Sequence, residues 1–429
     1  MVELNRQSAS ALARMIRAGE TTASAVMGAH LDRIAAREAE VGAFVYLDTE
    51  RAMELAEAAD RQPARGLLHG VPFAIKDIID TQDMPTACGS DLFAHRRPTR
   101  DAACVRKMLD AGAIPLGKTV TTEFAYFRPG KTANPHNLGH TPGGSSSGSA
   151  AAVADGMAPL AFGTQTAASL IRPAAFCGVC AFKPTTDTFD VSGVLPLAPS
   201  LDTLGFLARQ PDDFGLAYAV MTGSPLPAPG AFADRKPRIR LMRGPHWQEG
   251  SPEMREVVAR AMRILSEHGA ETGEVDHPPL FRELTDAQKA VMAYEAASTH
   301  ARLYDENRAG VSDQFAELVE AGRRITTEQY RAALDMRDRA KPLAEALFAD
   351  CDALLMASAP GEAPQGLGST GDPLFSRMWT LLQLPAVALP LGTGPQGLPL
   401  GIQLVGRRGG DERLLAVAQW AHDRFAASA

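Results

Sequence analysis

The chain has 429 residues, of which 45% are hydrophobic and 22% are charged, a composition typical of globular proteins. Its formal net charge is −7, so it lacks the positive excess expected of proteins that bind nucleic acid or anionic membranes. No apolar run approaches the roughly 18 residues needed to span a bilayer, and the N-terminus lacks the uninterrupted apolar core of a signal peptide. Five cysteines in apolar surroundings indicate reduced thiols and a cytoplasmic protein.

The first half of the chain alternates between helix and strand signals. Thr21 and Thr22 can cap a helix that begins at Ala23. Further helices are expected at residues 8–60, 102–111 and 149–156. Short β-branched runs predict strands at residues 70–80, 113–116 and 160–163. Residues 134–148 hold no periodic apolar face and predict a turn-rich loop.

The second half begins with a Pro- and Gly-rich stretch, residues 223–235, which is typical of a linker. An amphipathic helix is expected at 253–268, followed by a charged helical block at 286–349. Strand character returns from Asp352, and a terminal helix is expected from Asp411. Because the late strands need a sheet to join, we predict one α/β domain over residues 1–429, with a mixed, twisted sheet covered by helices on both faces. Its core would span about 65–215, its helical excursion about 250–350, and residues 352–429 would complete the sheet.

Several short motifs match known site patterns but lack the required context. Residues 112–119 match a phosphate loop, yet a helix precedes the first glycine and the loop itself is strand-like. Residues 144–148 match G-x-S-x-G without a buried strand before them. Cys177 and Cys180 lack a second ligand pair, and His136 and His140 lie in a loop, so no metal site is predicted.

Three other features carry chemistry: Lys76 in an apolar strand, Ser145 in a Gly-Gly-Ser-Ser-Ser loop, and Ser169, 24 residues later. Only eight lysines occur among 43 basic residues, and a lysine in an apolar strand would be costly to bury without a purpose. The blocks around these residues resemble the amidase-signature family. They are GVPFAIKDIID, GKTVTTEFA, NPHNLGHTPGGSSSGSAAAVA, TQTAASLIRPAAFCGVCAFKPT and the terminal LPAVALPLG…GLPLGIQLVG.

The resemblance implies an amidase that cleaves a carboxamide C–N bond, with no cofactor. Ser169 would be the nucleophile, Ser145 the bridging serine after a cis Gly144–Ser145 bond, and Lys76 the base. Lysine can accept a proton only when neutral, and burial beside apolar side chains would lower its pKa accordingly. The backbone N–H groups of Thr166, Ala167, Ala168 and Ser169 would form the oxyanion hole. The protein would bind a small amide substrate and would bind neither nucleic acid nor a membrane. Whether it forms a homodimer is left open.

The nucleophile segment departs from the commonest family pattern. Gln165 replaces an aspartate, Ala167 and Ala168 replace glycines, and Arg172 lies three residues after the serine instead of two. These features resemble the branch that contains bacterial malonamidase, which implies that Arg172 binds a substrate carboxylate; bracing the loop is the alternative. Gly144 and Ser146 are further candidate substrate contacts. Two other functions stay open: the A-type subunit of a tRNA-dependent amidotransferase, and a relative inactivated by strain at Ala168.

Overall fold

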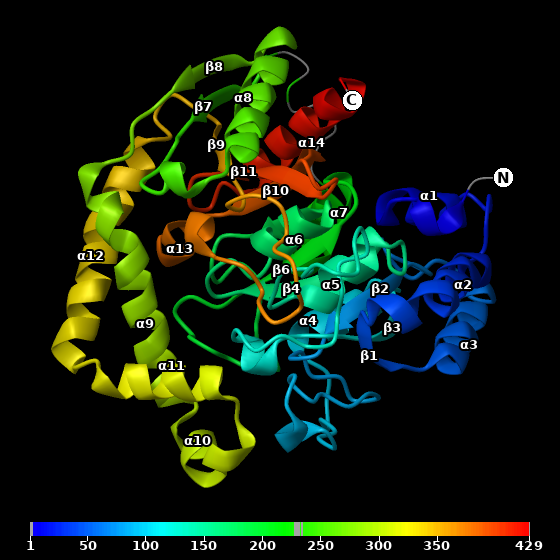
Figure 1. Ribbon diagram of the computed structural model, residues 1–429. Helices are drawn as coiled ribbons and strands as arrows, with labels where there is room; N and C mark the ends of the chain where they lie inside the picture. The colour runs from blue at the N-terminus through cyan, green and yellow to red at the C-terminus, as the bar shows by residue number, and fades with distance from the viewer. Residues whose placement is uncertain (1–2, 227–231, 233–234, 429) are drawn as a thin grey trace.

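The computed structural model describes residues 3–226, 232 and 235–428 (Figure 1). Its strands are β1 (Phe44–Leu47), β2 (Pro72–Lys76), β3 (Ile114–Thr119), β4 (Leu160–Gln165), β5 (Cys180–Lys183), β6 (Thr203–Ala208), β7 (Arg238–Leu241), β8 (Glu271–Glu274), β9 (Ala353–Ala357), β10 (Ala386–Thr393) and β11 (Pro399–Val405). All belong to one sheet, in the order β1-β3-β2-β4-β6-β5-β10-β11-β9-β7-β8.

The sheet is mixed. Strand β2 runs parallel to both of its neighbours, β3 and β4, and β7 runs parallel to β8 and β9. The strands between these two groups pair in antiparallel fashion. The two halves of the chain meet where β10 pairs with β5, with Ala386 opposite Lys183 and Val387 opposite Phe182. The late strands therefore complete the sheet begun by the first half, and the predicted α/β fold class is confirmed.

The helices lie on both faces of the sheet. They are α1 (Ala9–Arg17), α2 (Ala23–Val41), α3 (Thr49–Asp60), α4 (Ala103–Asp110), α5 (Ser147–Ala154), α6 (Ile171–Cys177), α7 (Asp212–Thr222), α8 (Pro252–Glu267), α9 (Leu284–Thr299), α10 (Ala301–Asn307), α11 (Asp313–Arg324), α12 (Thr327–Ala346), α13 (Leu374–Leu381) and α14 (Asp411–Ala427). Helices α5 and α6 contact each other and the central strands. Helices α4, α7, α8 and α14 form a second connected layer.

The structure adds strands that periodicity did not predict. Strand β1 interrupts the helical stretch expected at 8–60, and β5 follows α6 where only a loop and short helix were expected. Strands of four residues such as these are too short to show a period, so only their pairing partners define them. The would-be phosphate loop at 112–119 is largely strand β3. The proposed linker at 223–235 lies partly outside the described residues.

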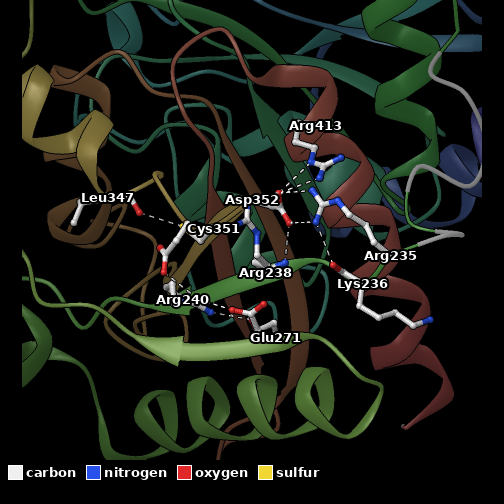
Figure 2. A network of polar contacts seen from close by, with 10 residues as sticks. Arg235, Lys236, Arg238, Arg240, Glu271, Leu347, Cys351, Asp352 and Arg413 are labelled. Atoms are coloured by element: carbon white, nitrogen blue, oxygen red, sulfur yellow. Dashed lines mark hydrogen bonds and ion pairs between the residues drawn. The ribbon is translucent and has the colours of Figure 1, made fainter.

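Asp352 attaches the segment after the linker to the sheet (Figure 2). Its carboxylate, 6% exposed, accepts hydrogen bonds from both terminal nitrogens of Arg235 at 2.8 and 2.9 Å. It also accepts from the Arg238 backbone N–H at 2.7 Å and from Arg413 Nη2 at 3.0 Å. One carboxylate thus joins the start of β7, the start of β9 and helix α14.

Helices α9 to α12 extend from one side of the sheet layers (Figure 1). Helix α9 contacts α11, α12 and α13, so this block packs on the body through α9 and α13. The described part of the excursion also contains strand β8, which the expected all-helical excursion did not include. Every helix among the described residues is too short or too polar to cross a bilayer.

Candidate active site

Lys76 is the last residue of β2, and Thr164 lies near the end of the neighbouring parallel strand β4. Because parallel strands end at the same edge of a sheet, their side chains meet there. Lys76 Nζ lies 2.7 Å from Ser145 Oγ and donates to Thr164 Oγ1, also at 2.7 Å. The lysine is fully buried, so both contacts are shielded from water.

Burial lowers the pKa of Lys76 to about 7, although the nearby Asp202 carboxylate acts to raise it. Removing an ammonium group from water is unfavourable, and the uncharged hydroxyls around it do not compensate for the lost hydration. No carboxylate among the described residues lies within ion-pair distance of Lys76. A substantial fraction of the side chain is therefore neutral near neutral pH and can accept a proton.

Ser145 follows a cis Gly144–Ser145 peptide bond in the loop before α5. Gly144 leaves no room for a side chain, because a Cβ there would lie 2.7 Å from Thr370 Cγ2. The next residue, Ser146, contacts the neighbouring strand. The Ser146 hydroxyl is fully buried against β4, where it donates to the Thr164 carbonyl at 3.3 Å and accepts from the Thr164 N–H at 3.2 Å. Ser146 thus aligns the loop with the strand and does not line the pocket described next.

Ser169 lies in the loop between β4 and α6 and lines the same pocket as Ser145. The pocket has a volume of about 20 Å³, against roughly 10–15 Å³ for one water molecule, so only a small group fits without side-chain movement. Its walls come from widely separated parts of the chain. The lining residues are Thr122, Ala125, Tyr126, Phe127, Ser145, Thr166, Ala167, Ser169, Arg172, Leu197, Met292, Thr370 and Pro373.

The carbonyl groups of residues 166–169 each accept a hydrogen bond, whereas the N–H groups of residues 167–169 do not donate one within the described chain. The carbonyls of Thr166, Ala167, Ala168 and Ser169 accept from Gln288 Nε2 (2.9 Å), Thr380 Oγ1 (2.7 Å), Arg172 N (2.9 Å) and Ser146 N (3.3 Å), in that order. The N–H groups of residues 167–169 donate to no other described residue. Three donors beside the serine hydroxyl are thus available to an oxygen anion.

Ala168 is not strained. The non-glycine residues with positive φ in the described chain are Cys88, Phe124, Ala125, Asp187 and Gln383. Since Ala168 adopts an ordinary backbone angle, its β-carbon replaces a glycine hydrogen without the conformational penalty considered from sequence. Gln165 also has a defined function here, because its Oε1 accepts from the N–H groups of Leu170 and Ile171 at 3.0 and 3.1 Å and orders the start of α6.

Arg172 is 3% exposed and has no carboxylate partner among the described residues. Its guanidinium donates to the carbonyls of Gly144 at 2.7 Å and Gly371 at 2.8 Å, and to Thr370 Oγ1 at 3.0 Å. Its Nε is buried without a partner in the described chain. Burial and then the nearby Arg377 lower the pKa of Arg172 to about 9, so it still carries a positive charge at neutral pH. It both braces the Gly144 loop and lines the pocket.

The discarded metal candidates serve as loop contacts. One ring nitrogen of His136 lies 2.9 Å from the Cys177 carbonyl, and one of His140 lies 2.8 Å from the Ala363 carbonyl. Cys177 and Cys180 are buried free thiols. Within the described ranges no group of three or more acidic, histidine or cysteine side chains is placed to hold a metal ion.

Comparison with known proteins places this geometry in a family. A family model described as Amidase matches residues 25–415. The chain belongs to the Amidase family. The A-type subunit of glutamyl-tRNA(Gln) amidotransferase from Acidothermus cellulolyticus is 34% identical, with 97% of this chain and 94% of the relative covered. A crystal structure of an amidase superposes with a TM-score of 0.89 at 30% identity, over 97% of this chain and 100% of that one. Peptide amidase from Stenotrophomonas maltophilia superposes with a TM-score of 0.82 at 27% identity, over 98% of this chain and 97% of that one.

This Amidase family member uses polar residues that the sequence patterns did not single out. They are Thr164, Asp202, Gln288, Arg377 and Thr380. Asp202 accepts from the Thr166 hydroxyl and from the N–H groups of Leu197 and Ala198, and burial raises its pKa to about 6. Thr164 lies within a strand and Asp202 just before one, and Gln288 lies in a helix more than 100 residues away from Thr166. Thr164 begins the block TQTAASLIRPAAFCGVCAFKPT but had no signal of its own, and the other four lie outside the quoted blocks.

Proposed function

We propose that the chain hydrolyses a small carboxamide through an acyl-enzyme on Ser169. The observation that carries this proposal is the contact between buried Lys76 and Ser145 in a pocket that also holds Ser169. A serine hydroxyl becomes a useful nucleophile when a neighbouring base takes its proton. Neutral Lys76 is that base, and Ser145 links it to Ser169.

The proposed reaction runs through Ser169, Ser145 and Lys76. Ser169 Oγ attacks the amide carbon, its proton passes to Ser145, and the Ser145 proton passes to Lys76. The carbonyl oxygen becomes an oxyanion that the N–H groups of Ala167, Ala168 and Ser169 stabilise. When the C–N bond breaks, the proton returns through Ser145 to the departing nitrogen. Water then attacks the ester by the same route and releases a carboxylate and free Ser169.

The test is replacement of the nucleophile. Ser169→Ala should abolish both amide turnover and covalent labelling by a fluorophosphonate, with the label mapped to Ser169 in the parent by peptide mass spectrometry. Labelling that persists in the variant, or that maps to Ser146 in the parent, would contradict the proposal.

For the substrate class we propose a short amide whose acyl group ends in a carboxylate. Arg172 supports this proposal because its buried guanidinium donates hydrogen bonds only to neutral oxygens in the described chain and otherwise lies over the Phe127 ring, 5.7 Å from its centroid. A substrate carboxylate would balance that charge and orient the amide carbon near Ser169. Because Arg172 and Ser169 line one pocket, an acyl chain that reaches both residues is short.

A second candidate is release of ammonia from glutamine for transfer to a partner protein. It is favoured by the curated relatives. The chain is 31–34% identical to several proteins named as the A-type subunit of glutamyl-tRNA(Gln) amidotransferase, including those of Acidothermus cellulolyticus and Salinispora arenicola. The same Ser169 acyl-enzyme would serve both functions, so the site chemistry alone does not separate them.

Substrate and partner dependence separate the two candidates. The isolated chain should hydrolyse a short dicarboxylic acid monoamide faster than L-glutamine by kcat/KM. In the second candidate, glutamine would be the better substrate and its turnover would rise when the remaining amidotransferase components and glutamyl-tRNA(Gln) are added. Ammonia release, measured with and without these components, distinguishes the two functions.

A further inference from the structure

Two residues of helix α13 hold the loop that carries Ser169 in place, one by a direct hydrogen bond and one through Gln288. Thr380 Oγ1 donates to the Ala167 carbonyl at 2.7 Å. One turn earlier, Arg377, which is 6% exposed, donates through Nη1 to Gln288 Oε1. Gln288, fully buried on α9, in turn donates through Nε2 to the Thr166 carbonyl at 2.9 Å. Helix α13 therefore holds two consecutive carbonyl groups: that of Ala167 directly through Thr380, and that of Thr166 indirectly through Gln288.

Holding these carbonyls also sets the direction of the oxyanion donors. In a planar trans peptide unit the C=O and the following N–H point in opposite directions. The Thr166 and Ala167 carbonyls are in trans units, since the cis bond in the described chain is Gly144–Ser145. Contacts to these carbonyls therefore direct the N–H groups of Ala167 and Ala168 to the other side of the loop, where no described residue takes them.

Arg377 determines which way the Gln288 amide faces. A guanidinium has only donors, so the amide atom next to it must be the carbonyl oxygen. The NH₂ group then has to face Thr166, where it donates. With Arg377 removed, the amide can rotate and bring its oxygen against the Thr166 carbonyl, which is a repulsive contact between two acceptors.

We infer that Arg377, Gln288 and Thr380 are positioning residues that aim the N–H groups of Ala167 and Ala168 at the oxyanion. This inference rests on the proposed amidase function and assigns an indirect role, since none of the three side chains lines the pocket of Ser145 and Ser169. The oxygen anion exists only in the transition state and tetrahedral intermediate. Loss of any of these three side chains should therefore lower kcat more than it raises KM.

The experiment uses variants that keep the shape of the side chain and remove its donor to the loop. Thr380→Val also removes the acceptor that Gln165 Nε2 uses at 3.0 Å. Gln288→Glu keeps the size but cannot donate to Thr166, and Thr380→Val keeps the shape but cannot donate to Ala167. Each should lower kcat about tenfold with KM changed less than about twofold, a smaller effect than deleting an oxyanion donor outright. Affinity for a reversible aldehyde analogue of the amide, which forms an oxyanion on Ser169, should fall in parallel. Thr380→Ser should restore the parent values.

A double-mutant cycle tests the role of Arg377. Arg377→Met should lower kcat about tenfold in the parent, but should change it less than about twofold in a Gln288→Met background, because no amide remains to be oriented. Equal losses in both backgrounds, or a selective rise in KM for acidic substrates, would overturn the inference and indicate a direct substrate contact. Normal kcat in Gln288→Glu and Thr380→Val would also overturn it. The Ser169→Ala variant is measured alongside. If it keeps full activity, the proposed function fails. If it is inactive, the outcomes above test the positioning residues alone.

Discussion

Lys76 combines a charged residue type with complete burial. Its side chain has no exposed surface, and its two hydrogen-bond partners are hydroxyl groups. Burial lowers its pKa from 10.5 to about 7, into the range where a general base works well at neutral pH. The same burial that makes a lysine unfavourable for folding therefore makes it suitable for accepting a proton.

The low pKa of Lys76 predicts that activity depends on pH. Because only deprotonated Lys76 can accept the Ser145 proton, kcat/KM should rise with pH through an ascending limb near pH 7. Lys76→Met should lower the rate by about 10²–10⁴-fold and remove that limb. The measurement is a pH–rate profile on parent and variant, over a range that brackets neutral pH. Retention of the limb in Lys76→Met would assign it to another group, with Asp202 as the first alternative.

The same residue predicts a pH dependence of stability. In the unfolded chain Lys76 titrates near its ordinary value of 10.5, whereas in the folded chain it titrates near 7. Between these values the unfolded state binds more protons, so the contribution of Lys76 to the unfolding free energy should increase as pH rises from about 7 towards 10. Lys76→Met should flatten this part of the curve. Urea unfolding at several pH values measures it, and identical slopes in both proteins would contradict the expectation.

One substitution can tell whether Arg172 only braces the Gly144 loop or also binds a substrate carboxylate. Arg172→Lys should weaken turnover of both neutral and acidic amides, because lysine cannot hold the Gly144 and Gly371 carbonyls together. If Arg172 also binds a substrate carboxylate, the loss should be about tenfold greater for the acidic amide. The measurement is kcat/KM for a matched acidic and neutral amide pair in both proteins. Equal losses would mean that Arg172 only braces the loop.

At the scale of elements, α9 connects the helical excursion to the active site. One stripe of this helix supplies Gln288 to the Thr166 carbonyl, Met292 to the pocket wall and Glu295 to Ser200. The spacing of these residues, four and then three, places them on the same face. His300, just beyond the helix end, lies 2.9 Å through Nε2 from the Pro196 carbonyl. The excursion thus supports the loop that carries Ser169 and lines the pocket of Ser145 and Ser169.

Met292 should therefore influence substrate length. Met292→Ala should enlarge the pocket and raise kcat/KM for amides with longer acyl chains relative to the shortest one. Met292→Leu, with nearly the parent volume, serves as the control and should keep the parent preference. The ratio of kcat/KM values across a chain-length series is the measurement, because a ratio is insensitive to the fraction of folded enzyme. An unchanged ratio in Met292→Ala would remove this side chain from specificity.

At the scale of the whole molecule, one carboxylate joins segments that are far apart in sequence. Asp352 contacts Arg235, Arg238 and Arg413 where the chain returns to the sheet after the stretch at 223–235 (Figure 2). Its carboxylate is nearly buried and its partners are about one third to one half exposed. This arrangement is more stabilising than an exposed ion pair, because water competes less for the carboxylate.

Asp352→Asn should lower the free energy of unfolding by about 1–3 kcal/mol, since charge-assisted hydrogen bonds from several donors become weaker. Activity per folded molecule should stay at the parent value, because the network lies outside the Ser169 pocket. The control is Glu306→Gln in the exposed Arg302–Glu306 pair, which should change stability by less than about 1 kcal/mol. Chemical denaturation of the three proteins measures the difference, and equal stabilities would contradict the assigned role of Asp352.

The sequence by itself predicted the α/β class and the main strands that carry the site, and it marked Lys76, Ser145 and Ser169 as candidates. The information behind these predictions is local: an apolar strand, a glycine-rich loop, or a spacing of 24 residues. Local periodicity was also sufficient for the long helices, whose amphipathic pattern repeats over several turns. The Thr22 cap of α2 follows from side-chain chemistry next to the helix start.

Only the tertiary structure decided the features that depend on long-range contact. The four-residue strands carry too few positions to show a period, so pairing defines them. Gln288 and Thr380 reach residues 166 and 167 from 122 and 213 positions away, and neither has a local signal. Comparison with glycine suggested strain at Ala168, but Ala168 is not among the described residues with a positive φ. The hydroxyl of Ser146, a candidate substrate contact from sequence, pairs with the Thr164 backbone. In each case a hydrogen-bond partner distant in sequence determined the role, and residue type and spacing do not encode that partner.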